Sequence, residues 1–497
     1  MTEHSPASEG PHASSARPPN IVTVILDCAR AKNFAHSGGE RIARTPFIDD
    51  LARRGTAFPR AVAPANWTVP SHFSLFTGKY PNVHGVRTFQ EWTTVPETTA
   101  KYLQRVGYET AMFTEMVHLV GGHGLEEGFE VRRSRLPGIS DEERTAANRL
   151  LGHAGFLYSP QVRNAISKLP PLVVPLTLLN YPQEVGFKNG VCGQYTLNYF
   201  EDWMKSRTPS RPFYAMFNFV NTHEPYRLDP SDRTIGFLDR MYLQTPRYYL
   251  LAVPGLQAHV RWDVLVSGYL RSIEEADSKV GRLLSLLDAH DELERTMIIV
   301  TADHGQSFGE MGNVFHGCGA SDSVTRVPLV VAPPSRWRLP GRVGRWVSLC
   351  EVDSWVRAAA ANLPPFDTQG RAPDPYGQIS PDSSIVYCEG GPASDPNRSL
   401  RGVRTDQLWN RPLLAAYRGD EKFVLDRSSG SILFWKGFDD ADRSAPEVLD
   451  VPRAISIRQE VFGQYEDQEA RRRELSPASA SPAEVGLDAR LRSWGYD

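Results

Sequence analysis

Apolar residues gather in short runs along this chain, and each run is followed by polar or small residues. The clearest run is 21–26, which is continuous and rich in β-branched side chains. A run of this kind is typical of a strand buried on both faces of a parallel sheet. Similar runs predict further strands at 110–114, 213–220, 297–301 and 328–332.

Between the apolar runs, hydrophobic residues recur at helical spacing. Thr45 followed by Pro46 is a helix-start signal, because threonine caps free N–H groups and proline suits the first turn. The segment 269–290 predicts a long helix with one apolar face. That face consists of Ile273, Ala276, Val280, Leu283, Leu284 and Leu287. Alternating strands and helices predict a doubly wound α/β fold, in which helices flank a mostly parallel sheet.

The pattern changes after about residue 360, where Pro, Gly, Asp and Ser become frequent. Short apolar runs at 385–388, 400–405 and 421–425 predict strands of a smaller C-terminal α+β subdomain. Two long segments before it predict insertions, either lids and binding loops or surface decoration. The predicted division is a disordered tail at 1–19, an α/β domain at 20–360 with insertions at about 131–190 and 228–262, a subdomain at 361–464, and a helix with a flexible tail at 465–497.

Composition mainly excludes certain partners and structural sites. The 497 residues include 55 basic and 58 acidic ones, and this near balance gives no electrostatic reason to expect nucleic acid or an acidic membrane as a partner. The five cysteines form no CxxC pair, so neither a disulfide scaffold nor a structural zinc site is expected. They are Cys28, Cys192, Cys318, Cys350 and Cys388.

No targeting or membrane segment is expected. Residues 1–19 have no apolar core of the kind that signal peptides need. The most apolar stretch, 169–179, is short and broken by three prolines, which favours a core or lid segment over a transmembrane segment. These features together predict a cytoplasmic protein. None of them predicts its oligomeric state.

Polar residues directly follow two of the predicted strands. Asp27 comes after the run 21–26, and Asp303 and His304 come after the strand at 297–301. Open α/β sheets place their ligands at the carboxyl ends of strands. A carboxylate beside an imidazole can reach one divalent cation.

Thr68 stands in the segment 66–81, Asn-Trp-Thr-Val-Pro-Ser-His-Phe-Ser-Leu-Phe-Thr-Gly-Lys-Tyr-Pro. This segment resembles the nucleophile signature of the sulfatase/alkaline-phosphatase superfamily, in which Cys or Ser, any residue, Pro, Ser and Arg precede a Leu-Thr-Gly stretch and a basic residue. The Asp-His-Gly at 303–305 resembles a metal-binding motif of the same superfamily. The resemblance implies an alkaline-phosphatase-like α/β fold. It also implies Asp27, Thr68, Asp303 and His304 as metal ligands.

One divalent metal ion is the implied cofactor. Cys28 stands where many sulfatases carry a second aspartate, and the loss of an oxygen ligand favours Mn or Zn, with Mg or Ca still possible. His223, in a His-x-Pro-Tyr loop, and His316 resemble positions that contact substrate oxygens, and Asn66 is a further candidate for substrate binding. A second metal stays open, because these two histidines could hold it but no carboxylate is evident beside them.

His72 and Lys79 complete the predicted catalytic set with Thr68. His72 stands where sulfatases have the arginine that holds a formylglycine diol. It either contacts substrate oxygen, acts as a general acid, or only packs. Lys79 occupies the basic signature position and either orients Thr68, neutralises charge or lies on the surface.

The threonine determines which reaction we expect. Sulfatases convert Cys or Ser to formylglycine, and threonine cannot follow that route. We therefore expect a metal-dependent hydrolase or transferase acting on a small-molecule phosphate ester, phosphodiester or phosphonate, with Thr68 attacking phosphorus to form a covalent phospho-enzyme. Two alternatives are a sulfate-ester hydrolase that works without formylglycine and an inactive sulfatase-like binding protein.

Overall fold

The computed structural model describes residues 17–39, 42–87, 96–116, 119, 124–134, 194–224, 226, 228, 235–244, 260–310, 314–373, 384–391, 411–437 and 445–475. Most of both predicted insertions and the predicted strand at 400–405 lie outside these residues. Within the described ranges, no helix is both long and apolar enough to cross a membrane.

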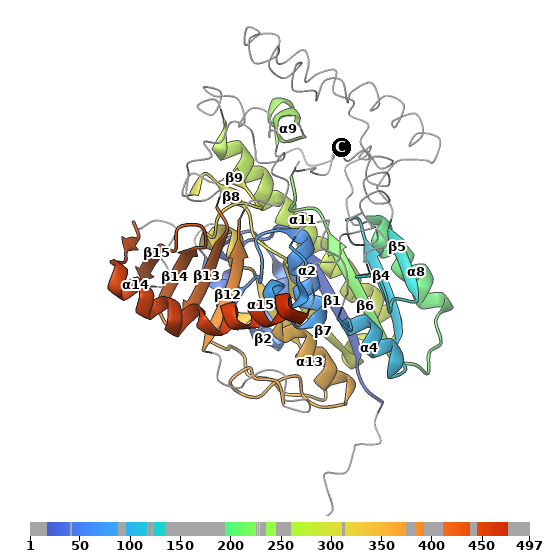
Figure 1. Ribbon diagram of the computed structural model, residues 1–497. Coiled ribbons are helices and arrows are strands. Elements are labelled where there is room, and N and C mark those ends of the chain that lie inside the picture. The colour runs from blue at the N-terminus through green and yellow to red at the C-terminus, as the bar shows by residue number, and fades with distance from the viewer. Residues whose placement is uncertain are drawn as a thin grey trace, which may run out of the picture.

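A seven-stranded sheet forms the centre of the larger part of the fold (Figure 1). Its strands are β1 (Asn20–Leu26), β2 (Thr56–Ala57), β4 (Glu109–Thr114), β5 (Val131–Ser134), β6 (Phe213–Phe219), β7 (Thr296–Thr301) and β10 (Leu329–Ala332). They lie in the order β2-β10-β7-β1-β6-β4-β5. The five strands from β7 to β5 are parallel, whereas β10 is antiparallel to both of its neighbours. The central strand β1 is buried along its whole length, which explains its unbroken apolar run.

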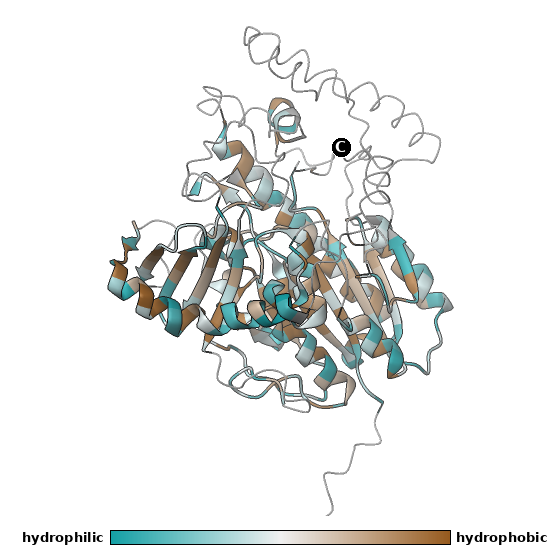
Figure 2. Cartoon of the chain, viewed as in Figure 1, coloured by the Kyte–Doolittle hydropathy of each residue, from teal (hydrophilic) through white to brown (hydrophobic). Residues whose placement is uncertain are grey.

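Helices cover both faces of this sheet (Figure 1). One group packs together as α1 (Pro46–Arg54), α8 (Gln194–Ser206), α9 (Phe237–Gln244) and α11 (Trp262–Ala289). The other group is α2 (Thr68–Thr77), α4 (Thr99–Arg105) and α13 (Glu351–Ala360). Figure 2 shows the apolar residues concentrated on the strands, with polar residues on the outer sides of the helices. The predicted fold class is therefore confirmed.

A second, antiparallel sheet follows in sequence. Its strands, in spatial order, are β12 (Ile385–Gly390), β13 (Leu413–Arg418), β14 (Glu421–Asp426), β15 (Ile432–Lys436) and β16 (Glu447–Val448). One face packs on Val62 and Trp346 of the larger part. The other face packs on Phe462 and Tyr465, at the start of the C-terminal helix α15 (Gly463–Leu475).

Several short elements connect these layers. They are β3 (Ala61–Val62), β8 (Ser307–Phe308), β9 (Val314–Phe315), β11 (Val347–Ser348), α3 (Pro81–His84), α12 (Asp322–Thr325), α14 (Val451–Ile457), the 3-10 turns η1 (Ala31–Asn33), η2 (Ala35–Ser37) and η5 (Leu293–Arg295), and the π-turn η8 (Arg458–Phe462). The sequence did not predict β5, β13 or β15.

Candidate active site

Three neighbouring strands end at one edge of the large sheet. Asp27 follows β1, Asp303 comes two residues after β7, and His223 lies in the turn after β6. Because these strands are parallel and adjacent, their carboxyl ends meet. The backbone N–H of Asp27 donates to the carbonyl of Phe219 at 3.0 Å, which fixes the β1 end against the β6 end.

Asp27 and Asp303 form a buried pair of carboxyl groups. Both side chains are fully buried, and the Oδ2 atom of each makes no hydrogen bond to any described residue. Burial and the neighbouring charge of Asp303 raise the pKa of Asp27. Burial acts the same way on Asp303, but His304 and His72 outweigh it and lower the pKa of Asp303. Buried carboxylates with open oxygen atoms favour a bound cation, because an unpaired buried charge is costly.

His304 presents a lone pair to this carboxyl pair. Its Nδ1 donates to the carbonyl of Gly305 at 2.9 Å, so in the neutral ring the lone pair lies on Nε2. That Nε2 lies 3.3 Å from Asp303 Oδ2. Two acceptors this close repel each other, and a metal ion bound between them would remove that repulsion. In metal-bound histidines the other ring nitrogen typically donates to a carbonyl, as Nδ1 does here. Gly305 is required here, since a Cβ at this position would lie 2.0 Å from the carbonyl oxygen of Ser323.

Thr68 is the first residue of α2 and is only 5% exposed. Its Oγ1 lies 3.2 Å from His304 Nε2. The free N–H groups at a helix N-terminus carry partial positive charge, which favours an anion beside this hydroxyl. The same turn is tied to Asp303, whose carbonyl accepts a bond of 2.5 Å from Ser71 Oγ.

His72 lies one turn further along α2 and is fully buried. Its Nδ1 donates to the carbonyl of Thr68 at 2.8 Å and lies 3.5 Å from Asp303 Oδ2. Its Nε2 lies 3.4 Å from Asn218 Nδ2. His72 thus contacts both Thr68 and Asp303 and helps to fix their positions.

Lys79 and Asn66 lie beyond opposite ends of α2. Lys79 follows the C-cap Gly78 and acts electrostatically on Asp353, at the end of α2 away from Thr68. Asn66 precedes the helix, and its Nδ2 donates to the carbonyl oxygens of Gly319, at 2.9 Å, and of Gly391, at 3.2 Å. Asn66 therefore anchors the Thr68 loop, whereas Lys79 is far from Thr68.

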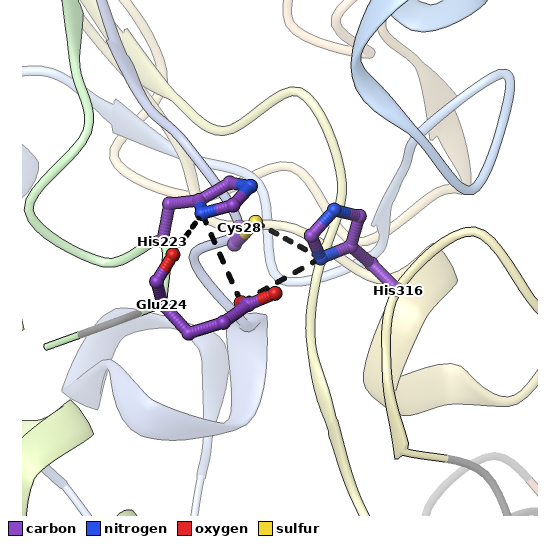
Figure 3. A group of neighbouring side chains, drawn as sticks. All are labelled: Cys28, His223, Glu224 and His316. Carbon is purple, nitrogen blue, oxygen red and sulfur yellow. Dashed lines mark hydrogen bonds and ion pairs between the residues drawn. The ribbon is translucent and has the colours of Figure 1, made fainter. Parts of the chain in front are cut away.

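The two predicted substrate-binding histidines meet Cys28 and Glu224 (Figure 3). The rings of His223 and His316 lie 4.8 Å apart, in an edge-to-face arrangement. His316 Nδ1 is 3.5 Å from Cys28 Sγ and 3.8 Å from Glu224 Oε2. The sequence showed no evident carboxylate beside these histidines and left a second metal open, whereas the turn after β6 brings Glu224 beside them. Glu224 directly follows His223 in sequence, and that adjacency was the signal that could have revealed it.

Cys28 faces the same cluster because of its backbone. Its φ of 64° places it in the left-handed region, which a cysteine rarely adopts. Two bonds hold it there: its N–H donates to Asp303 Oδ1 at 3.2 Å, and its carbonyl accepts from Tyr269 Oη at 2.8 Å. Burial and the charges of Asp27 and Glu224 raise the pKa of the Cys28 thiol well above its ordinary value.

Comparison with known proteins identifies the class. The sequence model of the family described as Sulfatase matches residues 19–343, so the chain belongs to the sulfatase family. Iduronate 2-sulfatase of Mus musculus is 22% identical over 360 residues, which cover 66% of this chain and 62% of the relative. Choline-sulfatase of Rhizobium meliloti is 27% identical over 347 residues, which cover 64% of this chain and 63% of the relative. The chain thus spans less than two thirds of the length of these relatives.

The fold is also shared with solved structures. The phosphonate monoester hydrolase of Agrobacterium radiobacter matches with a TM-score of 0.58 and 17% identity, over 91% of this chain and 96% of that chain. At this identity the likeness establishes the fold alone.

These findings correct the expected reaction. The relatives found by sequence are named for sulfate esters, whereas the phosphonate hydrolase is similar in fold only. Phosphate-ester cleavage is therefore wrong as the main interpretation. The physical reason is that Thr68 rules out formylglycine but does not choose between phosphorus and sulfur, because sulfate and phosphate esters are nearly equal in size and shape.

Proposed function

We propose that this chain hydrolyses a small-molecule sulfate ester with Thr68 in place of formylglycine. The observation that carries the proposal is the Thr68 hydroxyl, buried at the start of α2 and 3.2 Å from His304 Nε2. Membership of the sulfatase family and the names of its relatives support the ester class.

A divalent cation fits among Asp27, Thr68, Asp303 and His304. The open Oδ2 atoms of the two buried aspartates and the Nε2 lone pair of His304 form a mixed oxygen and nitrogen donor set. Such a set suits Mn²⁺ or Zn²⁺ better than Ca²⁺, which prefers more oxygen ligands. When bound, the cation would lower the pKa of the hydroxyl and offset negative charge on the ester.

The residues of the chain would then carry out the transfer. The Thr68 oxygen bonds to sulfur while the bond from sulfur to the alcohol oxygen breaks, and the threonine proton ends on the released alcohol. Water next attacks the sulfur of the threonine sulfate, releases sulfate and restores the hydroxyl. The N-terminus of α2 stabilises the anionic group throughout. His72 keeps the first turn of α2 and Asp303 in register.

A panel of chromogenic esters tests this proposal: a sulfate, a phosphate monoester, a phosphodiester and a phosphonate monoester, each with metal-stripped protein resupplied with Mn²⁺, Zn²⁺, Mg²⁺ or Ca²⁺. We expect metal-dependent turnover that is fastest with sulfate and that falls at least about 1,000-fold in Thr68→Ala. Thr77→Ala is the matched control, since Thr77 is also buried in α2 but bonds only the Phe73 carbonyl in the described structure. Sulfate turnover that survives Thr68→Ala, or a preference for a phosphorus ester, would contradict the proposal.

A further inference from the structure

Four potential metal ligands meet beside the proposed catalytic cation without belonging to its ligand set. They are Cys28, His223, Glu224 and His316, and one ligand atom from each lies within 4.8 Å of every other (Figure 3). They come from three separate segments: the end of β1, the turn after β6 and the loop after β9. Such convergence is a property of the tertiary fold, since no local turn places these four side chains together.

We propose that Cys28, His223, Glu224 and His316 form a second, thiolate-containing cation site that takes Zn²⁺. One sulfur, two imidazole nitrogens and one carboxylate oxygen are four donors that Zn²⁺ accepts, whereas Ca²⁺ and Mg²⁺ disfavour sulfur. The two histidines that the sequence assigned to substrate binding are then cation ligands. This inference does not depend on which ester the protein cleaves.

The spacing of the donor atoms suits a tetrahedral ion. Zinc bonds of about 2.0–2.3 Å give tetrahedron edges of roughly 3.3–3.8 Å. His316 Nδ1 is 3.5 Å from Cys28 Sγ and 3.8 Å from Glu224 Oε2. These three donors are therefore already close to the separations that a bound ion requires.

A hydrogen bond selects the nitrogen of His223 that is free to bind the ion. His223 Nδ1 donates to the backbone carbonyl of Glu224 at 2.6 Å, so its Nε2 is left as the coordinating nitrogen. A neutral imidazole has a lone pair to offer to a metal.

Gln306 bridges two members of the cluster, His316 and Glu224. Its Oε1 lies 2.9 Å from His316 Nδ1, and its Nε2 donates to Glu224 Oε2 at 2.5 Å. The amide thus holds together two groups that would otherwise share an ion. Binding would release the proton on Cys28, shift the His316 proton from Nδ1 to Nε2 and move this amide aside, so Zn²⁺ affinity should fall at low pH.

The second site borders the first. Cys28 also lies within 4.8 Å of the ligand atoms of Asp27 and His304, and the rings of His304 and His316 are 4.7 Å apart. The three carboxylates of Asp27, Asp303 and Glu224 are all buried in this small region. Together with the Cys28 thiolate they would carry four negative charges, which two dications would balance and one would not.

The test counts metal ions and reads the thiolate directly in the metal-stripped full-length protein. We expect two equivalents of Zn²⁺, and Co²⁺ loading should give a sulfur-to-cobalt charge-transfer absorption. Cys28→Ser should lose one equivalent and the absorption, while Cys350→Ser, a buried cysteine elsewhere, should lose neither.

Glu224→Gln provides a second route to the same answer if Cys28→Ser fails to fold. It should weaken binding of the second Zn²⁺ by at least about tenfold while the first equivalent stays bound. The proposal is overturned if the wild-type protein binds one equivalent only, or if the cobalt absorption is absent or survives Cys28→Ser.

Discussion

At position 68 a β-branched hydroxyl replaces the Cys or Ser of the sulfatase signature, and the residues around it determine its chemistry. Two buried aspartates with open oxygen atoms lie beside it, and His304 points its Nε2 at the hydroxyl. Neither aspartate is neutralised by an arginine or lysine in any ion pair of the described residues. The local charge balance is therefore the property that a single substitution at Asp27 should change most clearly.

Asp27→Asn should raise the free energy of unfolding of the metal-free protein. It should lower the free energy of unfolding of the metal-loaded protein. The substitution removes a buried carboxyl group whose pKa is raised by burial and by the charge of Asp303, and it also removes a metal ligand. For wild-type protein, metal at 100 times its dissociation constant should add about 2.7 kcal/mol to the free energy of unfolding. Thermal melts with and without Zn²⁺ or Mn²⁺ check this. A wild-type increment retained in Asp27→Asn would mean that Asp27 does not hold the ion.

Among the elements, the parallel strands β7, β1 and β6 position the site, and the sequence predicted them because each apolar run ends abruptly in polar residues. Asp27, Asp303 and His304 were predictable as site residues for this reason. The proximity of Cys28 and Glu224 was not predictable, because it depends on the conformations of the loops after β1 and β6.

The strands missed by sequence analysis had weaker signals. β13 reads Leu-Leu-Ala-Ala-Tyr-Arg, and alanine favours helices over strands. The antiparallel direction of β10 has no signal in its own sequence, because a buried apolar strand looks alike in either direction.

Helix α2 separates Thr68 from Lys79 by its whole length, roughly 15 Å for ten residues. Lys79→Met should therefore leave kcat/KM for the sulfate ester within about twofold of wild type. The free energy of unfolding should fall by no more than about 1 kcal/mol, because the lost interaction with Asp353 is partly exposed to solvent. Steady-state kinetics and denaturant unfolding measure both quantities. A 100-fold loss of kcat/KM would instead give Lys79 the catalytic role predicted from the signature.

At the scale of the whole molecule, the smaller sheet forms hydrogen bonds with the loop that precedes Thr68. Ala65 forms a β-bridge with Glu389 of β12, and the N–H of Asn66 donates to the Glu389 carbonyl at 3.1 Å. The Glu389 side chain pairs with Arg87 at 2.6 Å and accepts from Tyr465 Oη at 2.8 Å. Glu389 thus joins the Thr68 loop, the smaller sheet and the C-terminal helix.

Glu389→Gln should destabilise the protein by about 2 kcal/mol at neutral pH, because it removes the closer of two carboxylates that pair with the mostly buried Arg87, whereas Glu469 remains at 3.2 Å. Burial would raise the pKa of Glu389, but Arg87 outweighs it and lowers the pKa below its ordinary value of 4.5. This stabilisation is therefore complete above about pH 4.5 and is lost as pH falls through the lower folded-state pKa.

Denaturant unfolding across pH 3 to 7 measures this difference, which should shrink toward the acid end. Glu466→Gln is the matched control, because Glu466 pairs with the more exposed Arg458 at 2.9 Å and should cost about 0.5 kcal/mol or less. An equal loss from both substitutions would show that the Glu389 network does not hold the sheets together.

The most direct test of the account is to quench the protein during turnover of a chromogenic sulfate ester and to locate any sulfuryl group by peptide mass spectrometry. We expect a sulfuryl group on the peptide that carries Thr68, formed as fast as the alcohol is released and lost again when the ester is used up. Rapid sulfate release with Thr68 unmodified at every time point would contradict it, and so would a sulfuryl group on any other residue.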